Sequence, residues 1–192
     1  MNLHVGCGGT ILGGWINIDR RPMPGVDRVH DVRRGLPFDN ADFIFGEHFL
    51  EQLPLAGGLK FLAECRRVLT ERGVLRLTTP NLDWVWRTHY AADTGVMQCL
   101  DLNRAFHGWG HHFLYNRATL TGAVAAAGFA TIDFVRYGES GHEALRNLES
   151  HPHSPDLGGA ESLLVIEASG RATPDGTLWA DAAAHIYDMG IE

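Results

Sequence analysis

Short apolar runs alternate with helical patterns along most of this chain, and that alternation restricts the fold more than any other feature. Residues 3–5 and 15–19 have the length and composition of strands. Over residues 55–69, apolar side chains recur at helical spacing, and Gly73 follows as a stop. Strands that alternate with helices favour a parallel sheet with helices on its faces, and such sheets bind ligands at the carboxyl ends of their strands.

Further elements continue this alternation. Strands are predicted over residues 27–32, 41–46, 74–79, 131–137 and 163–168, and helices over residues 116–127 and 178–189. Residues 81–115 hold three of the five Trp and four of the eleven His, so we interpret them as a lid or substrate-facing insert. The chain therefore divides into one domain over residues 1–170, which includes the insert, and a C-terminal extension over residues 171–192.

The composition limits the partners and the compartment. The chain of 192 residues is long enough for one domain, and its net charge of −7 opposes binding to nucleic acid or anionic membranes. No apolar stretch has the length of a membrane span, and the first residues lack the layout of a signal peptide. Cys7, Cys65 and Cys99 are widely spaced and odd in number, as expected of reduced thiols. We therefore expect a cytoplasmic protein without a nucleic-acid or membrane partner.

Glycines follow the first predicted strand directly. Gly6, Gly8 and Gly9 leave no Cβ between the backbone amides and a ligand, although an ordinary glycine turn would look the same. Asp19 ends the next strand, where a carboxylate can accept both hydroxyls of a ribose, and Asp31 stands at the predicted end of the third strand. This order of elements favours a nucleotide site at the edge of the sheet.

Together with the downstream motifs, these residues resemble the class I S-adenosylmethionine-dependent methyltransferases of the type 11 kind. Over residues 3–83 the resemblance rests on Gly6-Cys7-Gly8, Asp19, Asp31 with residues 36–38, residues 47–53, residues 67–69, Gly73, Leu75 and Pro80. Residues 111–116, 120, 127–129, 139–140, 145–149 and 151 are similar to the downstream half of small methyltransferases from surface-glycan or natural-product pathways.

The resemblance implies an α/β, Rossmann-like fold with a seven-stranded, mostly parallel sheet in the order 3-2-1-4-5-7-6, in which the last strand is antiparallel. S-adenosylmethionine would lie along its carboxyl edge. The implied cofactor-binding residues are Gly6, Cys7 and Gly8 at the methionine part, Asp19 at the ribose, Asp31 and Val32 at the adenine, and Glu47 beside the transferable methyl group. An acidic rim suits a ligand that carries an ammonium and a sulfonium charge.

Two departures from the family pattern concern the covering of this site. Only eleven positions separate Gly8 from Asp19, where the family needs nearly twice that span, so the first helix is shortened or missing. The sequence also starts at the first strand, so no preceding helix is expected over the cofactor. Residues 81–115 or a partner chain, such as the second copy of a homodimer, would then close the pocket.

Histidines are the candidates for a general base if the acceptor is a hydroxyl. His48, after the fourth strand, and His111 are the predicted catalytic residues, with His112 as a further candidate. Each is equally consistent with an ordinary packing or hydrogen-bonding role. His107 and His111 have the spacing of zinc ligands on a helix, but the glycines between them oppose a helix, so no metal site is expected.

The aromatic side chains of residues 81–115 have two interpretations. They wall an acceptor pocket, or they pack the insert onto the domain. The set is Trp84, Trp86, Tyr90, Phe106 and Trp109.

The leading prediction is an S-adenosylmethionine-dependent methyltransferase that acts on the oxygen or nitrogen of a small-molecule acceptor in glycan or natural-product metabolism. An alternative is a catalytically inactive nucleotide-fold protein that binds or scaffolds, because a helix is missing after Gly9. A nicotinamide-dependent oxidoreductase is disfavoured, since residues 6–9 lack the later glycine and the helix start that hold a pyrophosphate.

Overall fold

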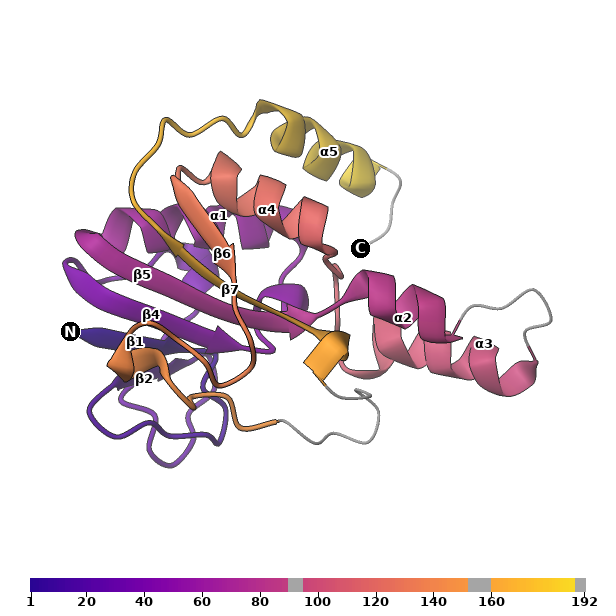
Figure 1. Cartoon of the computed structure of the whole chain (residues 1–192), viewed down its shortest axis with the longest axis horizontal. Helices are drawn as coiled ribbons and strands as arrows, with labels where there is room; N and C mark the ends of the chain where they lie inside the picture. Colours follow the sequence, from indigo (N-terminus) through magenta and orange to yellow (C-terminus); the bar gives the residue numbers. More distant parts are fainter. Residues whose placement is uncertain (90–94, 152–159, 189–192) are drawn as a thin grey trace.

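The computed structural model describes residues 1–89, 95–151 and 160–188, and its strands form one seven-stranded sheet (Figure 1). The strands are β1 (Asn2–Val5), β2 (Ile16–Asp19), β3 (Arg28–Val29), β4 (Ala41–Glu47), β5 (Leu69–Pro80), β6 (Thr131–Phe134) and β7 (Leu163–Ser169). They lie in the order β3-β2-β1-β4-β5-β7-β6. Strands β1 to β5 pair in parallel, and β7 is antiparallel to both β5 and β6. The expected strand order is therefore confirmed.

The helices of the described residues follow the predicted pattern in most places. They are α1 (Leu55–Val68), α2 (Leu82–His89), α3 (Val96–Asn103), α4 (Arg117–Ala126) and α5 (Thr177–Asp188). A reciprocal pair of hydrogen bonds starts α4: the Asn116 side chain accepts from the Thr119 amide, and the Thr119 hydroxyl accepts from the Asn116 amide. None of these helices is both long and apolar enough to cross a membrane.

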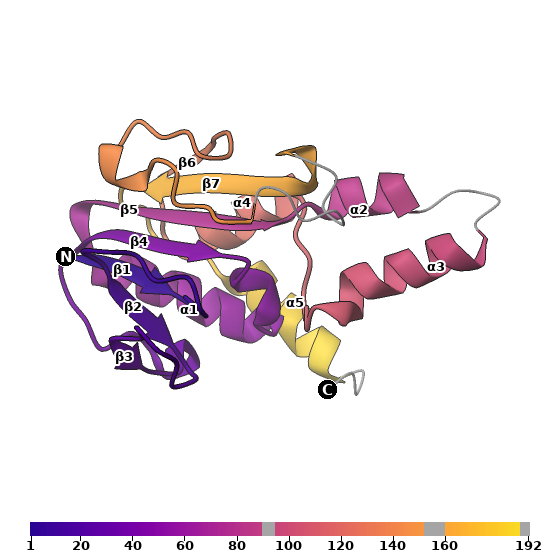
Figure 2. The same cartoon turned by 90° about the horizontal axis from the view of Figure 1, so that it is seen from below.

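One face of the sheet carries the helical layer. Helices α1, α4 and α5 lie together above the sheet in Figure 1 and behind it in Figure 2. Alternate strand residues, such as Ile44, Leu75 and Ile166, point into the core that these helices enclose, and Trp179 of α5 packs against it. The extension over residues 171–192 thus contributes a helix to the main core.

Loops cover the opposite face. Residues 6–15 contain no helix, and residues 135–151 contain only the short 3-10 helix η4 (Glu143–Leu145). Trp15 lies edge-on to the buried ring of Phe45, with ring centroids 6.4 Å apart. The first crossover of the sheet is therefore a loop, as the short spacing predicted, and the first helix of the family pattern is missing.

Some predicted bounds are corrected. The third strand ends at Val29 because Asp31 caps the 3-10 helix η1 (Val32–Arg34), accepting from the Arg33 amide at 3.0 Å. Strand β5 starts directly after α1 and not at residue 74. The connection over residues 81–115 contains α2, α3 and the π-helix η3 (Arg104–Gly108). Tyr90, one of its predicted aromatic residues, lies outside the described residues.

Candidate functional site

The chain turns at the carboxyl end of β1 through two glycines with a left-handed backbone. The φ angles are 63° at Gly6 and 53° at Gly8, a region that other residues rarely adopt. The Cys7 amide donates to the Ile18 carbonyl at 3.1 Å, which fixes the turn against β2. Burial and the charge of Asp19 raise the pKa of the Cys7 thiol to about 11, so the thiol stays protonated. A Cβ at Gly8 would meet no atom within 4 Å, so a ligand has room beside this turn.

Asp19 ends β2 beside the glycine turn. The residue is 7% exposed, and its Oδ2 accepts a hydrogen bond from the Gly8 amide at 3.0 Å. Its Oδ1 accepts from the Arg21 amide at 2.9 Å. Each carboxylate oxygen has a second lone pair, so Asp19 can still accept from the hydroxyls of a ribose. The structure thus brings Asp19 and the turn into direct contact.

Asp31 and Val32 follow β3 next to β2. The His30 amide donates to the Asp19 carbonyl at 2.9 Å, which holds the segment in place. Hydrogen bonds from the Arg33 side chain, with Nη2 2.6 Å from Oδ2, lower the pKa of the Asp31 carboxyl to about 2. Val32 is buried. The Asp31 carboxylate is therefore ionised and engaged by Arg33.

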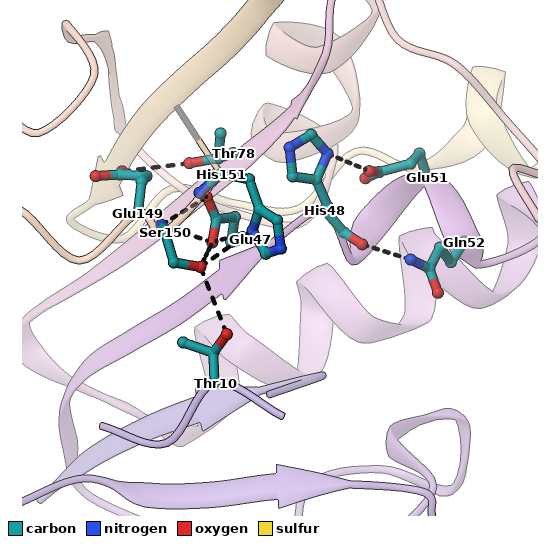
Figure 3. Close-up of polar contacts among 9 residues, drawn as sticks. All are labelled: Thr10, Glu47, His48, Glu51, Gln52, Thr78, Glu149, Ser150 and His151. Atoms are coloured by element: carbon teal, nitrogen blue, oxygen red, sulfur yellow. Dashed lines mark hydrogen bonds and ion pairs between the residues drawn. The ribbon is translucent and has the colours of Figure 1, made fainter. Parts of the chain in front are cut away.

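Glu47, the last residue of β4, is surrounded by donors from a distant part of the chain (Figure 3). The Ser150 amide lies 3.0 Å from both carboxylate oxygens, and the Ser150 hydroxyl donates to Oε2 at 2.9 Å. The His151 amide donates to Oε1 at 3.2 Å, and its Nδ1 lies 2.9 Å from Oε2. Burial raises the pKa of the Glu47 carboxyl, but these hydrogen bonds outweigh burial and hold the pKa below its ordinary value. Glu47 is therefore ionised at neutral pH.

We expect Glu47→Gln to lower the free energy of unfolding at neutral pH by about 1–3 kcal/mol, because a neutral amide replaces the nearly buried carboxylate and its charge-assisted hydrogen bonds with Ser150 and His151. The lowered pKa means that ionised Glu47 stabilises the fold above its ordinary pKa of 4.5, and that this stabilisation is lost as the pH falls through the lowered value. Urea denaturation at neutral and acid pH measures the difference between the two chains.

The matched control for this prediction is Glu71→Gln. Glu71 is exposed and pairs with Arg171 at 2.8 Å, so its replacement has little effect at either pH. A stability difference between wild type and Glu47→Gln that stays constant into the acid range contradicts the assignment.

His48 follows Glu47 with a positive φ of 48°. Its Nδ1 lies 3.2 Å from Oε1 of Glu51, whose side chain is fully buried. Its Nε2 is buried and has no hydrogen-bond partner among the described residues. Burial lowers the pKa of His48, but the hydrogen bond and the charge of Glu51 outweigh it, so the pKa is raised. The predicted base thus lies at the end of β4 with its ring largely enclosed.

His111 occupies a different environment. Its Nδ1 lies 2.7 Å from the Ala105 carbonyl oxygen. The amide of His112 donates to the Glu51 carbonyl at 2.7 Å, so the backbone of this segment lies beside the end of β4. The π-helix η3 contains His107 but ends before His111, so the two rings do not share a helix. No three His, Cys, Asp or Glu side chains are arranged to hold a metal ion in the described ranges.

Three residues of this site received no role in the sequence analysis: Glu51, Ser150 and His151. The spacing of Glu51, three residues after His48, was the signal for a short-range pair. Ser150 and His151 lie 103 and 104 positions from Glu47, and no local pattern predicts a contact over that distance. Only the downstream resemblance had drawn attention to residue 151.

The fold has counterparts among solved structures. A possible exported protein from Bordetella parapertussis superposes with a TM-score of 0.56 and 11% identity over 89% of this chain and 62% of its own. The pyocyanin biosynthetic protein PhzM gives a TM-score of 0.53 and 15% identity over 89% and 50% of the two chains. LepI in complex with S-adenosylmethionine gives a TM-score of 0.51 and 11% identity over 88% of this chain and 42% of its own.

The strand order and the antiparallel β7 point to the same fold as the comparison with these neighbours. The fold is that of the class I S-adenosylmethionine-dependent methyltransferases. No family model matches the sequence, and no curated protein matches it either. The chain spans 42–62% of the length of these three neighbours.

Proposed function

We propose that this chain is an enzyme that transfers a methyl group from S-adenosylmethionine to a small-molecule acceptor. One observation carries the proposal: the glycine turn and Asp19 are joined by the Gly8–Asp19 hydrogen bond of 3.0 Å at the carboxyl edge of a methyltransferase sheet. Open space at Gly8 and a nearly buried carboxylate fit the backbone and ribose contacts of an adenosyl ligand.

The residues proposed to hold the cofactor are Gly6, Cys7 and Gly8 at its methionine part, Asp19 at its ribose, and Asp31 with Val32 at its adenine. The bound cofactor supplies a methyl group on a good leaving group. The protein's main task is then to hold the acceptor atom in line with that methyl group, and such positioning is worth several kcal/mol of the barrier.

A cavity of about 760 Å³ beyond the carboxyl end of β5 is proposed as the acceptor site. Trp86 and Phe106, both from the insert over residues 81–115, give it aromatic walls, which supports a substrate-facing role for that insert. Arg87, Arg117 and Asp83 also line it. Arg87 Nε donates to the Asp83 carbonyl at 3.2 Å, and the Arg117 guanidinium lies 3.9 Å from the centroid of the Phe134 ring. An acceptor with a ring and an acidic or hydroxyl-rich group suits these walls.

We also propose that the acceptor belongs to glycan or natural-product metabolism and receives the methyl group on oxygen or nitrogen. The protein would act in the cytoplasm, as a homodimer. Transfer of labelled methyl from S-adenosylmethionine to a panel of phenolic, carboxylic and sugar acceptors tests it. Binding of the cofactor without turnover across the panel would favour the second candidate, a binding or scaffolding protein, which the missing first helix suggests.

We expect Asp19→Ala to weaken the binding of S-adenosylhomocysteine by about 1–3 kcal/mol, or roughly 5- to 150-fold, because the ribose loses a buried acceptor. Isothermal titration calorimetry measures the affinity, and thermal unfolding confirms that the variant is folded. Asp133→Ala is the matched control, since it removes an exposed acid at the opposite edge of the sheet, on β6. Equal affinities of wild type and Asp19→Ala would refute the ribose assignment.

Calorimetry with a nicotinamide dinucleotide tests the remaining alternative, a nicotinamide-dependent oxidoreductase. Residues 6–15 provide no helix N-terminus for a pyrophosphate, so we expect no binding of the dinucleotide. Dinucleotide binding that competes with S-adenosylhomocysteine would instead favour an oxidoreductase.

A further inference from the structure

Ser150 and His151 lie between the glycine turn and the end of β4. Besides its contacts with Glu47, the Ser150 hydroxyl lies 3.4 Å from the hydroxyl of Thr10, a residue of the loop that follows the glycines (Figure 3). The two residues therefore connect both sides of the edge at which the cofactor is proposed to bind.

The segment is anchored from within the protein by the residue that precedes it. Glu149 has a fully buried side chain, and its Oε1 accepts from Arg76 Nε at 2.7 Å and from the Thr78 hydroxyl at 3.3 Å. The Gly138 amide donates to its Oε2 at 3.2 Å. Because Glu149 is fixed in this way, residues 150 and 151 are held against Glu47 and do not depend on that contact alone.

The carboxylate of Glu47 has no free acceptor position in this arrangement. A carboxylate offers about four lone pairs, and four donors from Ser150 and His151 occupy them. A cofactor ammonium group would have to displace one of these donors. Glu47 therefore acts on the site through Ser150 and His151.

His151 is better placed than His48 to reach a ligand. The side chain of His151 is 57% exposed, whereas that of His48 is 19% exposed and its Nε2 is buried. The two rings are nearly perpendicular, with centroids 5.7 Å apart, so they share one corner of the site. Because the Glu47 carboxylate only accepts hydrogen bonds, the neutral form of His151 carries its proton on Nδ1 and has its lone pair on Nε2.

We propose that Ser150 and His151 cover the methyl-transfer end of the cofactor site, that Nε2 of His151 faces the acceptor, and that Glu47 is the positioning residue of His151. This inference rests on the proposed function. With a hydroxyl acceptor, Nε2 takes the hydroxyl proton as the acceptor oxygen bonds to the methyl carbon and the sulfur–methyl bond breaks. The sulfur would leave as the neutral thioether of S-adenosylhomocysteine, and the proton later passes from Nε2 to water. Nδ1–H remains bonded to Glu47 throughout.

Labelling with diethyl pyrocarbonate, which acylates accessible neutral imidazoles, tests the position of His151. Peptide mapping by mass spectrometry gives a rate for each histidine. We expect His151 to react faster than His48, and S-adenosylhomocysteine at about ten times its Kd to slow His151 about tenfold, because only the unbound fraction reacts. His142 is the internal control: it is exposed in the same loop, lies against Phe43, and keeps its rate.

The outcomes separate this inference from the function on which it rests. If S-adenosylhomocysteine binds in an Asp19-dependent way but leaves the labelling of His151 unchanged, Ser150 and His151 do not cover the cofactor site. The proposed function then still stands. If the ligand does not bind to the wild-type chain, the proposed function fails and takes the inference with it.

A double-mutant cycle tests the role of Glu47. We expect Glu47→Gln to weaken binding of S-adenosylhomocysteine about fivefold in the wild-type background, and less than about twofold in a chain that carries Ser150→Ala and His151→Ala. Equal losses in both backgrounds would mean that Glu47 binds the cofactor itself. If the variants do not fold, the labelling experiment on the wild-type chain still decides the position of His151.

Discussion

Arg76→Met is expected to lower the free energy of unfolding by about 3–5 kcal/mol, because it leaves buried carboxylates without their cation. Arg76 lies on β5, on the face of the sheet that the loops cover, and has no exposed surface. Its Nε donates to Glu149 at 2.7 Å and its Nη1 to Glu167 at 2.6 Å, and Nη1 also donates to the Glu139 carbonyl at 2.9 Å. One side chain therefore holds both the loop before Ser150 and strand β7.

Arg171→Met is the matched control for Arg76→Met. Arg171 pairs with Glu71 at 2.8 Å, but both side chains are substantially exposed, so the expected loss is about 1 kcal/mol or less. Urea denaturation of the two variants gives the comparison. Similar small losses for both would show that the loop over residues 135–151 is not held by this buried network.

Gly6→Ala is expected to destabilise the chain by about 2–4 kcal/mol, from the sum of backbone strain and overpacking. The φ of 63° at Gly6 is unfavourable for alanine, and its Cβ would lie 2.1 Å from Cδ2 of Phe49. The Phe49 ring cannot move freely, since it packs edge-on against the buried Phe61 with centroids 5.1 Å apart. Thermal and urea unfolding measure the effect.

Gly13→Ala is the control in the same loop region. A Cβ at Gly13 would meet no atom within 4 Å, and its φ is not positive, so we expect a change of less than about 1 kcal/mol in either direction. A Gly6→Ala chain as stable as Gly13→Ala would show that the turn does not need its left-handed backbone.

Local patterns predicted most of the strands and the helices α1, α4 and α5, whereas the strand order followed from the family resemblance. The apolar periodicity over residues 55–69 and the Ala-rich stretch before Gly128 placed α1 and α4 to within a few residues, because such signals act over one or two turns. The short interval between Gly8 and Asp19 predicted a loop in place of the first helix. The predicted third strand was too long, since the Asp31 carboxylate accepts a hydrogen bond from the Arg33 amide and η1 starts at that point.

The candidate site was predictable only where its residues directly follow strands. The glycine turn, Asp19 and Glu47 lie at the ends of β1, β2 and β4, so the sheet itself brings them to one edge. Ser150 and His151 reach that edge through a long loop whose position depends on the buried Arg76 network. A contact of that kind depends on tertiary packing, which a single sequence does not reveal.

A crystal structure with S-adenosylhomocysteine is the most direct measurement of the central claim, that the glycine turn and Asp19 hold an adenosyl ligand. The account predicts ribose hydroxyls within hydrogen-bond distance of the Asp19 carboxylate and the amino-acid part beside Gly8. Density for the ligand at any other edge of the sheet, or none at saturating concentration, would contradict it.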